Sequence, residues 1–325
     1  LSCHCNNIFG IQRKSPGLVR WFYSYLFFRC QCVRVDRQYS RWLYLAGGMP
    51  QGSLRGVFAF LLLIDDLSLR CLIHKYVDDT TLTELLPRDS PASQMHTFLQ
   101  CLQAWSRNNK MKINCTKTKE MILGPLARCP PELLTGSTDS KSVSIERVQQ
   151  FKLLGINLSH DMCWQAHIDA ISTKAASRLH FLRILKKSGL NPGHLLHFYL
   201  TVIRPLLEYC SVVWHHTLSK TQSESLEAIQ RRALRIIYPQ TVGLSYSSAL
   251  QYADLSSLYN RREKANKQFF RSILQPSSCI FPLLPPQRDP NITSRLRNAS
   301  IYPRPATRTK RYMSFIDHCL LTCQD

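Results

Sequence analysis

The spacing of hydrophobic and polar residues divides the chain into a mixed first part and a helical second part. Before about residue 160, helix-like stretches alternate with short runs of β-branched and aromatic residues, which Gly, Pro, Asn or Asp interrupt. After it, apolar residues recur at three- and four-residue steps over long stretches, as on one face of a helix. The pattern predicts an α+β protein whose strands lie in the first part.

In the first part, helices and strands are expected to alternate. Ser90 and Pro91 suit the N-cap and first position of a helix whose apolar face continues to Trp105. The expected elements are a helix at 16–28, a two-strand ribbon at 33–44, a buried helix or strand at 57–67, a helix from 90 to 109, a strand pair or strand–turn element at 111–123, a loop at 124–144 and a strand region at 148–158.

The second part is expected to form helices at 168–189, 191–205 and 219–239, and one more beyond residue 245. A capping box at 219–222 marks one helix start, and Pro205 is expected to interrupt or kink the helix that contains it. From residue 276, proline density and basic charge predict an irregular tail. The helices carry the basic residues Lys174, Arg178, Arg183, Lys186, Lys187, Arg231, Arg232 and Arg235.

One stretch, residues 71–83, combines a strand pattern with two adjacent carboxylates. Apolar and β-branched residues flank Asp78 and Asp79, which predicts a strand, a tight turn at 77–79 and a returning strand. Two acids at such a turn could hold a divalent cation. An ordinary turn with solvated carboxylates explains the same stretch, and these residues alone do not separate the two interpretations.

The composition favours a polyanionic partner. The chain has 42 Lys and Arg against 21 Asp and Glu, a net charge of +21, and 44% of its residues are hydrophobic. This apolar share is typical of a globular protein, and a basic excess spread along the chain favours nucleic acid over an anionic membrane surface. A basic surface that is merely solvated is the remaining alternative. The longest apolar run, Val57 to Ile64, is too short to span a bilayer.

The cysteines and the N-terminus give weaker signals. None of the 13 cysteines forms a CxxC pair, so we expect reduced structural thiols, not a zinc site or a disulfide framework. The first residues lack the apolar segment of a signal peptide, and the compartment, cytoplasmic or nuclear, is unknown from the sequence. The sequence begins with Leu, so we expect an incomplete reading frame or a processed piece.

A series of motifs follows in a fixed order along the chain. The motifs are Gly48-Met49-Pro50-Gln51-Gly52-Ser53, residues 60–67, Tyr76-Val77-Asp78-Asp79, residues 114–119, residues 151–156, residues 164–168 and residues 229–233. Together they resemble the reverse transcriptases of non-LTR (LINE-like, jockey/CR1-type) retrotransposons. They look like that family's GxPQGS loop, FLLYINDL segment, Y[AV]DD catalytic box, NxxKTK element, primer-grip strand and two post-palm helices.

The resemblance implies a fold and an activity. The fold would be an incomplete right-hand polymerase palm, with an antiparallel sheet and helices, followed by an all-helical thumb and extension. The implied division is 1–158 for partial fingers and palm, 159–240 for a thumb-like region, and 241–325 for a basic helical extension and irregular tail. The implied activity is RNA-directed DNA polymerisation with Mg²⁺, dNTPs, an RNA template and a DNA primer or duplex. No membrane is implied, and no protein partner can be inferred.

The resemblance also implies roles for single residues. The implied metal-binding and catalytic residues are Asp78, Asp79 and Lys117, and the implied nucleotide- or template-binding residues are Gly48, Gln51, Gly52 and Tyr76. Asp78 would be a direct ligand of a two-metal site for phosphoryl transfer, with Asp79 in support. Lys117 would neutralise or protonate the leaving pyrophosphate, or is a plain surface lysine. The other acid pair, at 65–66, is interpreted as a helix-end feature.

Two departures from the family pattern reduce the expected activity. The family's third carboxylate lies in an FDxxKAFD-type strand upstream of the helix at 16–28, and residues 1–10 do not contain it. Arg55 stands where the family has a Leu-Ser-Pro-like sequence and could disturb the loop before it. We therefore expect an N-terminally truncated, inactive polymerase. The alternatives are a non-enzymatic basic nucleic-acid-binding remnant, or a reading frame without a selected function.

Overall fold

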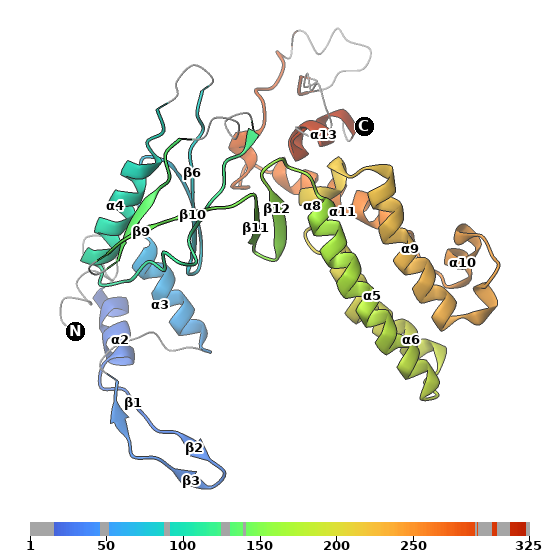
Figure 1. The fold of residues 1–325 in the computed structure, drawn as a ribbon, viewed down its shortest axis with the longest axis horizontal. Coiled ribbons are helices and arrows are strands. Elements are labelled where there is room, and N and C mark those ends of the chain that lie inside the picture. Colours follow the sequence, from blue (N-terminus) through green and yellow to red (C-terminus); the bar gives the residue numbers. More distant parts are fainter. Residues whose placement is uncertain are drawn as a thin grey trace. The chain divides into compact units, whose positions relative to one another are not determined.

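The computed structural model describes residues 16–45, 52–87, 92–124, 131–138, 141–289, 291, 301–303 and 313–322. The chain forms two compact units (Figure 1). Unit 1 comprises Leu1–Glu120 and Arg128–Val148, and unit 2 comprises Met121–Ala127 and Gln149–Asp325. The α+β composition expected from the sequence is confirmed, whereas the three-part division at 158 and 240 stays a prediction. No helix in the described ranges is long and apolar enough to cross a membrane.

Unit 1 combines helices with short strand pairs. Its elements are α2 (Pro16–Leu26), β1 (Cys30–Gln31), β2 (Arg34–Val35), β3 (Gln38–Tyr39), β4 (Leu43–Tyr44), α3 (Leu54–Ile64), β5 (Leu72–Tyr76), β6 (Asp79–Thr83), α4 (Met95–Asn108), β7 (Lys119–Glu120), β8 (Thr135–Thr138), β9 (Lys141–Ser144) and β10 (Glu146–Arg147). The pairs β1–β4, β2–β3, β5–β6 and β8–β9 are antiparallel, and β7–β10 is parallel. Within the described ranges every sheet is two-stranded, so these residues do not join into one palm sheet.

Helices α2 and α3 form a small apolar core. Phe22 of α2 packs with Ala59 and Leu63 of α3, and all three are buried. Ser53 caps the N-terminus of α3 by accepting a hydrogen bond from the backbone N–H of Arg55 at 3.2 Å. The helix expected at 16–28 and the helical alternative for 57–67 are therefore confirmed to within a few residues.

Two sequence expectations for unit 1 are wrong. Helix α4 begins at Met95, while residues 92–94 are not helical and the expected start at 90–91 lies outside the described residues. Ser93 Oγ accepts from Met95 N, the first N–H of the helix, at 3.2 Å. The Glu84 carboxylate holds this start in place by accepting from Ser93 Oγ at 2.7 Å and from Gln94 N at 2.8 Å. The expected loop at 124–144 contains the hairpin β8–β9, whose Gly136 lies against the Cys115 sulfur.

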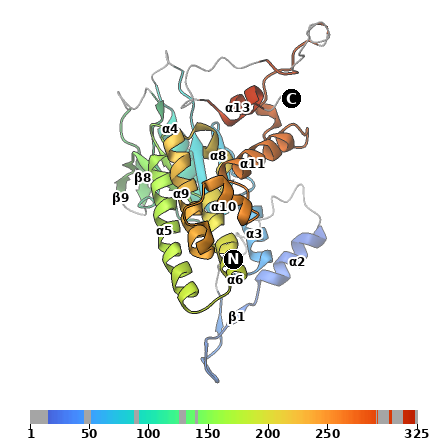
Figure 2. The same cartoon turned by 90° about the vertical axis from the view of Figure 1, so that its right-hand side faces the viewer.

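Unit 2 is a strand pair followed by helices (Figures 1 and 2). Its elements are β11 (Gln150–Leu153), β12 (Ile156–Ser159), α5 (Gln165–Lys187), α6 (Pro192–Phe198), the π-turn η2 (Tyr199–Ile203), α7 (Arg204–Glu208), α8 (Ser211–Trp214), η3 (His215–Thr217), α9 (Lys220–Ile237), η4 (Pro239–Thr241), α10 (Tyr246–Tyr252), α11 (Leu258–Ile273), η5 (Phe281–Leu283) and α13 (Phe315–Thr322). The capping box at the start of α9 is present as expected. Pro205 was expected to interrupt its helix. The structure has the π-helical segment η2, which ends at Ile203, between α6 and the helix α7 that contains Pro205.

The strand region at 148–158 is an antiparallel hairpin. Leu154 and Gly155 form its two-residue turn, with φ values of +46° and +89°. Tyr209 holds this turn by donating a hydrogen bond from its hydroxyl to Leu154 O at 2.9 Å. A Cβ on Gly155 would approach the same tyrosine ring at 3.2 Å, so both backbone conformation and space favour glycine here.

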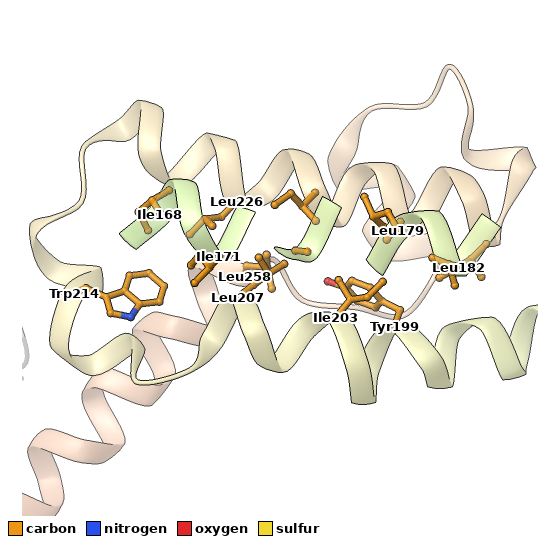
Figure 3. Close-up of a cluster of buried hydrophobic side chains, with 14 of the residues drawn as sticks. Ile168, Ile171, Leu179, Leu182, Tyr199, Ile203, Leu207, Trp214, Leu226 and Leu258 are labelled. Atoms are coloured by element: carbon orange, nitrogen blue, oxygen red, sulfur yellow. The ribbon is translucent and has the colours of Figure 1, made fainter. Parts of the chain in front are cut away.

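The main core of unit 2 lies between α5, α9 and the α6–α7 segment (Figure 3). Small residues sit at the contact of α5 with α9, where Ala175 and Ala233 are both fully buried. Larger side chains fill the remaining space, and Figure 3 shows Tyr199, Leu182 and Trp214 directed into it. Figures 1 and 2 both show α5 and α9 side by side. Apolar packing along this seam therefore sets the geometry of unit 2.

A polar network lies next to this core. The Glu227 carboxylate caps the N-terminus of α11 by accepting from the backbone N–H groups of Leu258 at 3.2 Å and Tyr259 at 2.6 Å, and it also accepts from the Tyr246 hydroxyl. Arg262, which is 1% exposed, has Nη2 3.8 Å from a Glu227 oxygen. A buried charge needs such partners, because an unpaired one is costly to desolvate.

His215 joins this network as a neutral group. Arg262 Nε donates to His215 Nδ1 at 3.1 Å, so Nδ1 must carry a lone pair. The proton therefore lies on Nε2, which donates to Glu263 Oε1 at 3.1 Å. Burial, and next the positive charge of Arg262, lower the pKa of His215 from 6.5 to about 3.

This lowered pKa predicts an acid-sensitive unit 2. Between pH 6.5 and 3 the unfolded chain binds a proton at His215 that the folded chain does not, so stability present above pH 6.5 is lost as pH falls. We expect His215 to account for a loss of about 2 kcal/mol in the free energy of unfolding between pH 7 and 5. In His215→Gln the side-chain amide can keep both hydrogen bonds without titrating. Urea unfolding at the two pH values should show a smaller loss for this variant; an equal loss would contradict the prediction.

Candidate functional site

The Asp78–Asp79 pair lies at the end of the β5–β6 hairpin. The strands pair from Leu72↔Thr83 to Tyr76↔Asp79, which leaves Val77 and Asp78 as a two-residue turn. Val77 has a φ of +53°, a left-handed conformation that β-branched residues rarely adopt. Such backbone strain persists only where the surroundings hold it. Both carboxylates are exposed, and the predicted strand–turn–strand is confirmed.

Lys75 ties this hairpin to helix α3. Its Nζ donates to the carbonyl oxygens of Ile64 at 2.9 Å, Asp65 at 3.2 Å and Leu67 at 3.1 Å. These carbonyls lie at the C-terminal end of α3, where a positive charge also complements the helix dipole. Asp78 lies three positions after Lys75, so the clamp fixes the base of the carboxylate-bearing turn.

The other acid pair has a structural place. Asp65 is the C-cap residue of α3, which confirms the expected helix-end feature. Asp66 Oδ1 accepts a hydrogen bond from the indole Nε1 of Trp105 at 3.2 Å, which links the end of α3 to α4.

Lys117 is presented by a turn that Asn114 organises. Asn114 Oδ1 accepts from Lys117 N at 3.1 Å and from Thr116 Oγ1 at 2.6 Å, while its backbone oxygen accepts from Thr118 Oγ1 at 2.9 Å. Such Asx turns are typical of Asn. Lys119, two positions after Lys117, forms an ion pair with Glu146 across β7–β10. Lys117 itself is exposed.

The structure brings only some of the implied site residues together. Tyr76 and Asp79 are direct cross-strand partners. Gly52 has a φ of +73°, which glycine adopts readily, while Gly48 and Gln51 lie outside the described residues. Among the residues described, no group of three or more His, Cys, Asp or Glu side chains could hold a metal ion. The roles of all seven residues therefore stay predictions.

The basic residues of unit 2 fall into two sets. Lys186 donates to Ile236 O, Arg178 donates to Val202 O, and the Arg231 guanidinium lies 4.9 Å from the centre of the Tyr246 ring. These three side chains support the packing of the helices. The exposed members of the α5 and α9 sets are Lys174, Arg183, Lys187, Arg231, Arg232 and Arg235, so Arg231 belongs to both sets.

Sequence reasoning missed the residues that hold the site in place. Lys75 and Glu84 lie in strand-like or loop-like stretches, and nothing in their local pattern marks a clamp or a remote cap. Only Asp66 carried a signal, because an acid at a helix end was already expected there. Each of these contacts joins residues about ten or more positions apart.

Comparison with known proteins identifies the family. Residues 4–158, which include the hairpin and the Asn114 turn, match the family model described as reverse transcriptase (RNA-dependent DNA polymerase). This part of the chain belongs to the reverse transcriptase family. The prediction of a non-LTR retrotransposon reverse transcriptase is thereby confirmed, as three curated relatives also support.

These relatives come from Drosophila melanogaster. This reverse transcriptase chain is 27% identical to the RNA-directed DNA polymerase from mobile element jockey, over 68% of the chain and 25% of the relative. It is 26% identical to the probable RNA-directed DNA polymerase from transposon BS, over 66% of the chain and 25% of the relative. It is 21% identical to the probable RNA-directed DNA polymerase from transposon X-element, over 89% of the chain and 32% of the relative. The chain thus spans about a quarter to a third of the length of these relatives.

Two further comparisons add little. Residues 164–204, in α5 to α7, match the family model described as alkylated DNA repair protein alkB homolog 8, N-terminal. This short match covers a helical segment of unit 2 and carries no functional conclusion. No solved structure matches the reverse transcriptase chain.

The Lys75 clamp gives a prediction for the hairpin. Lys75→Met keeps the length of the side chain but removes all three hydrogen bonds, so we expect the hairpin to lose about 1–3 kcal/mol of local stability. Amide hydrogen exchange over residues 72–83 measures this loss directly. Lys117→Met, which removes an exposed lysine, should leave exchange in the hairpin unchanged. Equal protection in Lys75→Met and the wild type would contradict the clamp.

Proposed function

We propose that this chain supplies two parts of an RNA-directed DNA polymerase. Unit 1 is a portion of the palm that carries Asp78 and Asp79, and unit 2 is a thumb-like helical part that holds nucleic acid. The observation that carries the proposal is the strained, exposed Asp78–Asp79 turn, clamped by Lys75 within the segment that matches the reverse transcriptase family.

The proposed cofactor is Mg²⁺. Carboxylate oxygens are the ligands that Mg²⁺ prefers, and in this family bound ions would activate the attacking group and stabilise charge on the phosphoryl group. Asp78 and Asp79 fit part of such a site, because both are exposed on one turn. Two carboxylates do not surround two ions, and the described residues add no third. These residues therefore fit the metal site only in part.

Other residues of unit 1 are proposed to position the substrates. Tyr76 precedes the turn, is 63% exposed and can line the cleft beside the primer end. Gly52 allows backbone to approach the template base and the incoming dNTP, together with Gly48 and Gln51. Lys117 is exposed on the Asn114 turn and can neutralise the charge of the leaving pyrophosphate.

The exposed basic side chains of α5 and α9 are proposed to contact the backbone of the template–primer duplex. Phosphate contacts of this kind are strongly salt-dependent and nearly independent of sequence. Among the basic residues of these helices, Lys174, Arg232 and Arg235 are exposed, whereas Lys186 and Arg178 are bound to backbone carbonyls. The exposed set also supports the alternative function of a non-enzymatic nucleic-acid-binding protein.

Duplex binding tests the proposed role of unit 2. A labelled RNA–DNA hybrid should bind the whole chain, and the double variant Arg232→Gln, Arg235→Gln should reduce the slope of log affinity against log salt by about 1.8. The double variant Lys264→Gln, Lys267→Gln removes the same charge from exposed positions of α11 and serves as the control. No binding at low salt, or equal slopes for both double variants, would exclude this role.

A primer-extension assay distinguishes the two candidate functions, polymerase and non-enzymatic nucleic-acid-binding protein. Because the described residues bring no third carboxylate to Asp78 and Asp79, we expect the 325-residue chain alone to give no extension on an RNA template with Mg²⁺ or Mn²⁺. Extension that disappears in Asp78→Asn would show instead that the chain is an active polymerase. Extension unchanged in Asp78→Asn would point to a contaminating enzyme.

A further inference from the structure

A second basic surface lies in unit 1, where α2 meets the first turn of α3. Trp21 and Tyr25 are one turn apart on α2 and stack with ring centres 5.9 Å apart and planes 10° apart. The Arg55 guanidinium lies 5.0 Å from the centre of the Trp21 ring and 5.5 Å from that of Tyr25. Arg29 lies 5.8 Å from the centre of the Tyr25 ring. We call these four residues the arginine–aromatic ladder.

The ladder is held in place by the fold of unit 1. The hydroxyl groups of Tyr25 and Ser53 are 3.1 Å apart and hydrogen-bonded, and Ser53 in turn caps α3. Phe22, next to Trp21 in the sequence, is buried against α3, so α2 is fixed in rotation about its axis. Trp21 remains 43% exposed and Arg55 is exposed. The ladder is therefore a preformed surface, because its side chains are already stacked and anchored.

The charge around the ladder is almost entirely arginine. Residues 16–64 contain one acidic residue, Asp36, and no lysine or histidine. The six cations of this stretch are Arg20, Arg29, Arg34, Arg37, Arg41 and Arg55. Within the described part of the chain, neither Arg29 nor Arg55 forms an ion pair with a carboxylate. Their guanidinium groups keep N–H donors for the anion of a partner.

Arginine and aromatic side chains together match one class of partner. A guanidinium group binds a phosphate through two parallel hydrogen bonds and stacks on ring faces, which an ammonium group does not. Aromatic faces beside such cations take unpaired bases, as in proteins that bind single strands. A duplex offers phosphates but keeps its base faces stacked.

The same pairing recurs along the neighbouring ribbon. Arg29 O accepts from Leu45 N at 2.8 Å, so the ribbon of β1 to β4 begins directly at the ladder. Farther along, the Arg34 guanidinium lies 5.4 Å from the centre of the exposed Tyr39 ring. The basic and aromatic character of the ladder thus continues into an adjacent exposed element of unit 1.

We propose that the arginine–aromatic ladder binds single-stranded nucleic acid, with phosphates at Arg29 and Arg55 and a base stacked on Trp21. The proposal rests on the proposed function and adds a second, single-strand site in unit 1 to the duplex contacts of unit 2. It also gives a role to Arg55, which departs from the family pattern. Arg55 supplies one of the two cations of the ladder, the other being Arg29.

Fluorescence anisotropy with a labelled 20-nucleotide oligouridylate tests the proposal on the whole chain. The double variant Arg29→Gln, Arg55→Gln should weaken binding roughly tenfold and lower the slope of log affinity against log salt by about 1.4, the value for two contacts to a single strand. Trp21→Leu should weaken binding about tenfold without changing the slope, because it removes stacking and no charge. Arg70→Gln, at an exposed arginine outside the ladder, removes one charge and is the control for position; it should change neither affinity nor slope.

The possible results separate binding from packing. Thermal unfolding of each variant shows whether a loss of affinity follows from a loss of folded protein. Lower stability with unchanged affinity and slope would make the ladder a helix clamp and overturn the proposal. An equal loss in Arg70→Gln would show non-specific charge and overturn it as well. Displacement of the RNA by polyglutamate, with no effect of Trp21→Leu, would assign the surface to an acidic protein instead.

A measurement on the wild type covers the case in which the double variant does not fold. Oligouridylate that contains 4-thiouridine can be photo-cross-linked to the chain, and the cross-linked peptides identified by mass spectrometry. Cross-links within residues 21–29 would support the ladder, and cross-links confined to unit 2 would overturn it. The duplex experiment uses other variants and another probe, so failure at α9 and failure at the ladder are distinguishable.

Discussion

The position of the candidate catalytic turn depends on one ammonium group. The sheets of unit 1 are two-stranded in the described residues, and an isolated two-stranded ladder is only marginally stable in water. Lys75 supplies what the ladder lacks, because its Nζ binds three carbonyls at the end of α3. The Trp105–Asp66 hydrogen bond joins the same helix end to α4. Polar side chains thus fix this hairpin in unit 1.

Unit 2 is held by a different interaction. Close apolar packing of α5 against α9 forms its core, with alanines where the helices meet. The polar groups beside this core are mutually satisfied, as Glu227, Arg262 and His215 show. Part of the basic charge also supports packing, because Lys186 and Arg178 bind backbone carbonyls. The positive charge of the helices is therefore not one uniform binding surface.

Arg55 departs from the family pattern and is part of the arginine–aromatic ladder. From the sequence, an arginine at this place was expected to disturb the loop before α3. In the structure it stacks on Trp21 and Tyr25, and the N-cap of α3 is intact. The loop residues themselves lie outside the described residues. The contact joins α2 to α3 and leaves a cationic face toward solvent.

Local sequence patterns were enough to predict the features that depend on near neighbours. Apolar periodicity identified α2, α3, α5 and α9, the capping box marked the start of α9, and alternation around two acids identified the β5–β6 hairpin. The family motifs pointed to the same hairpin as a metal-binding site, a role that remains a prediction. These signals are local, because a turn, a cap or an amphipathic face is set by residues a few positions apart.

The side chains that hold these elements together were found only in the folded chain. Glu84 holds Ser93 and Gln94 just before α4, Lys75 clamps the hairpin, and Lys186 donates to the carbonyl of Ile236, 50 residues away. The hairpin β8–β9 formed in a stretch whose composition indicates a loop. The three side-chain contacts share one physical reason. Such contacts depend on where distant backbone groups come to lie after packing, and no local pattern encodes those positions.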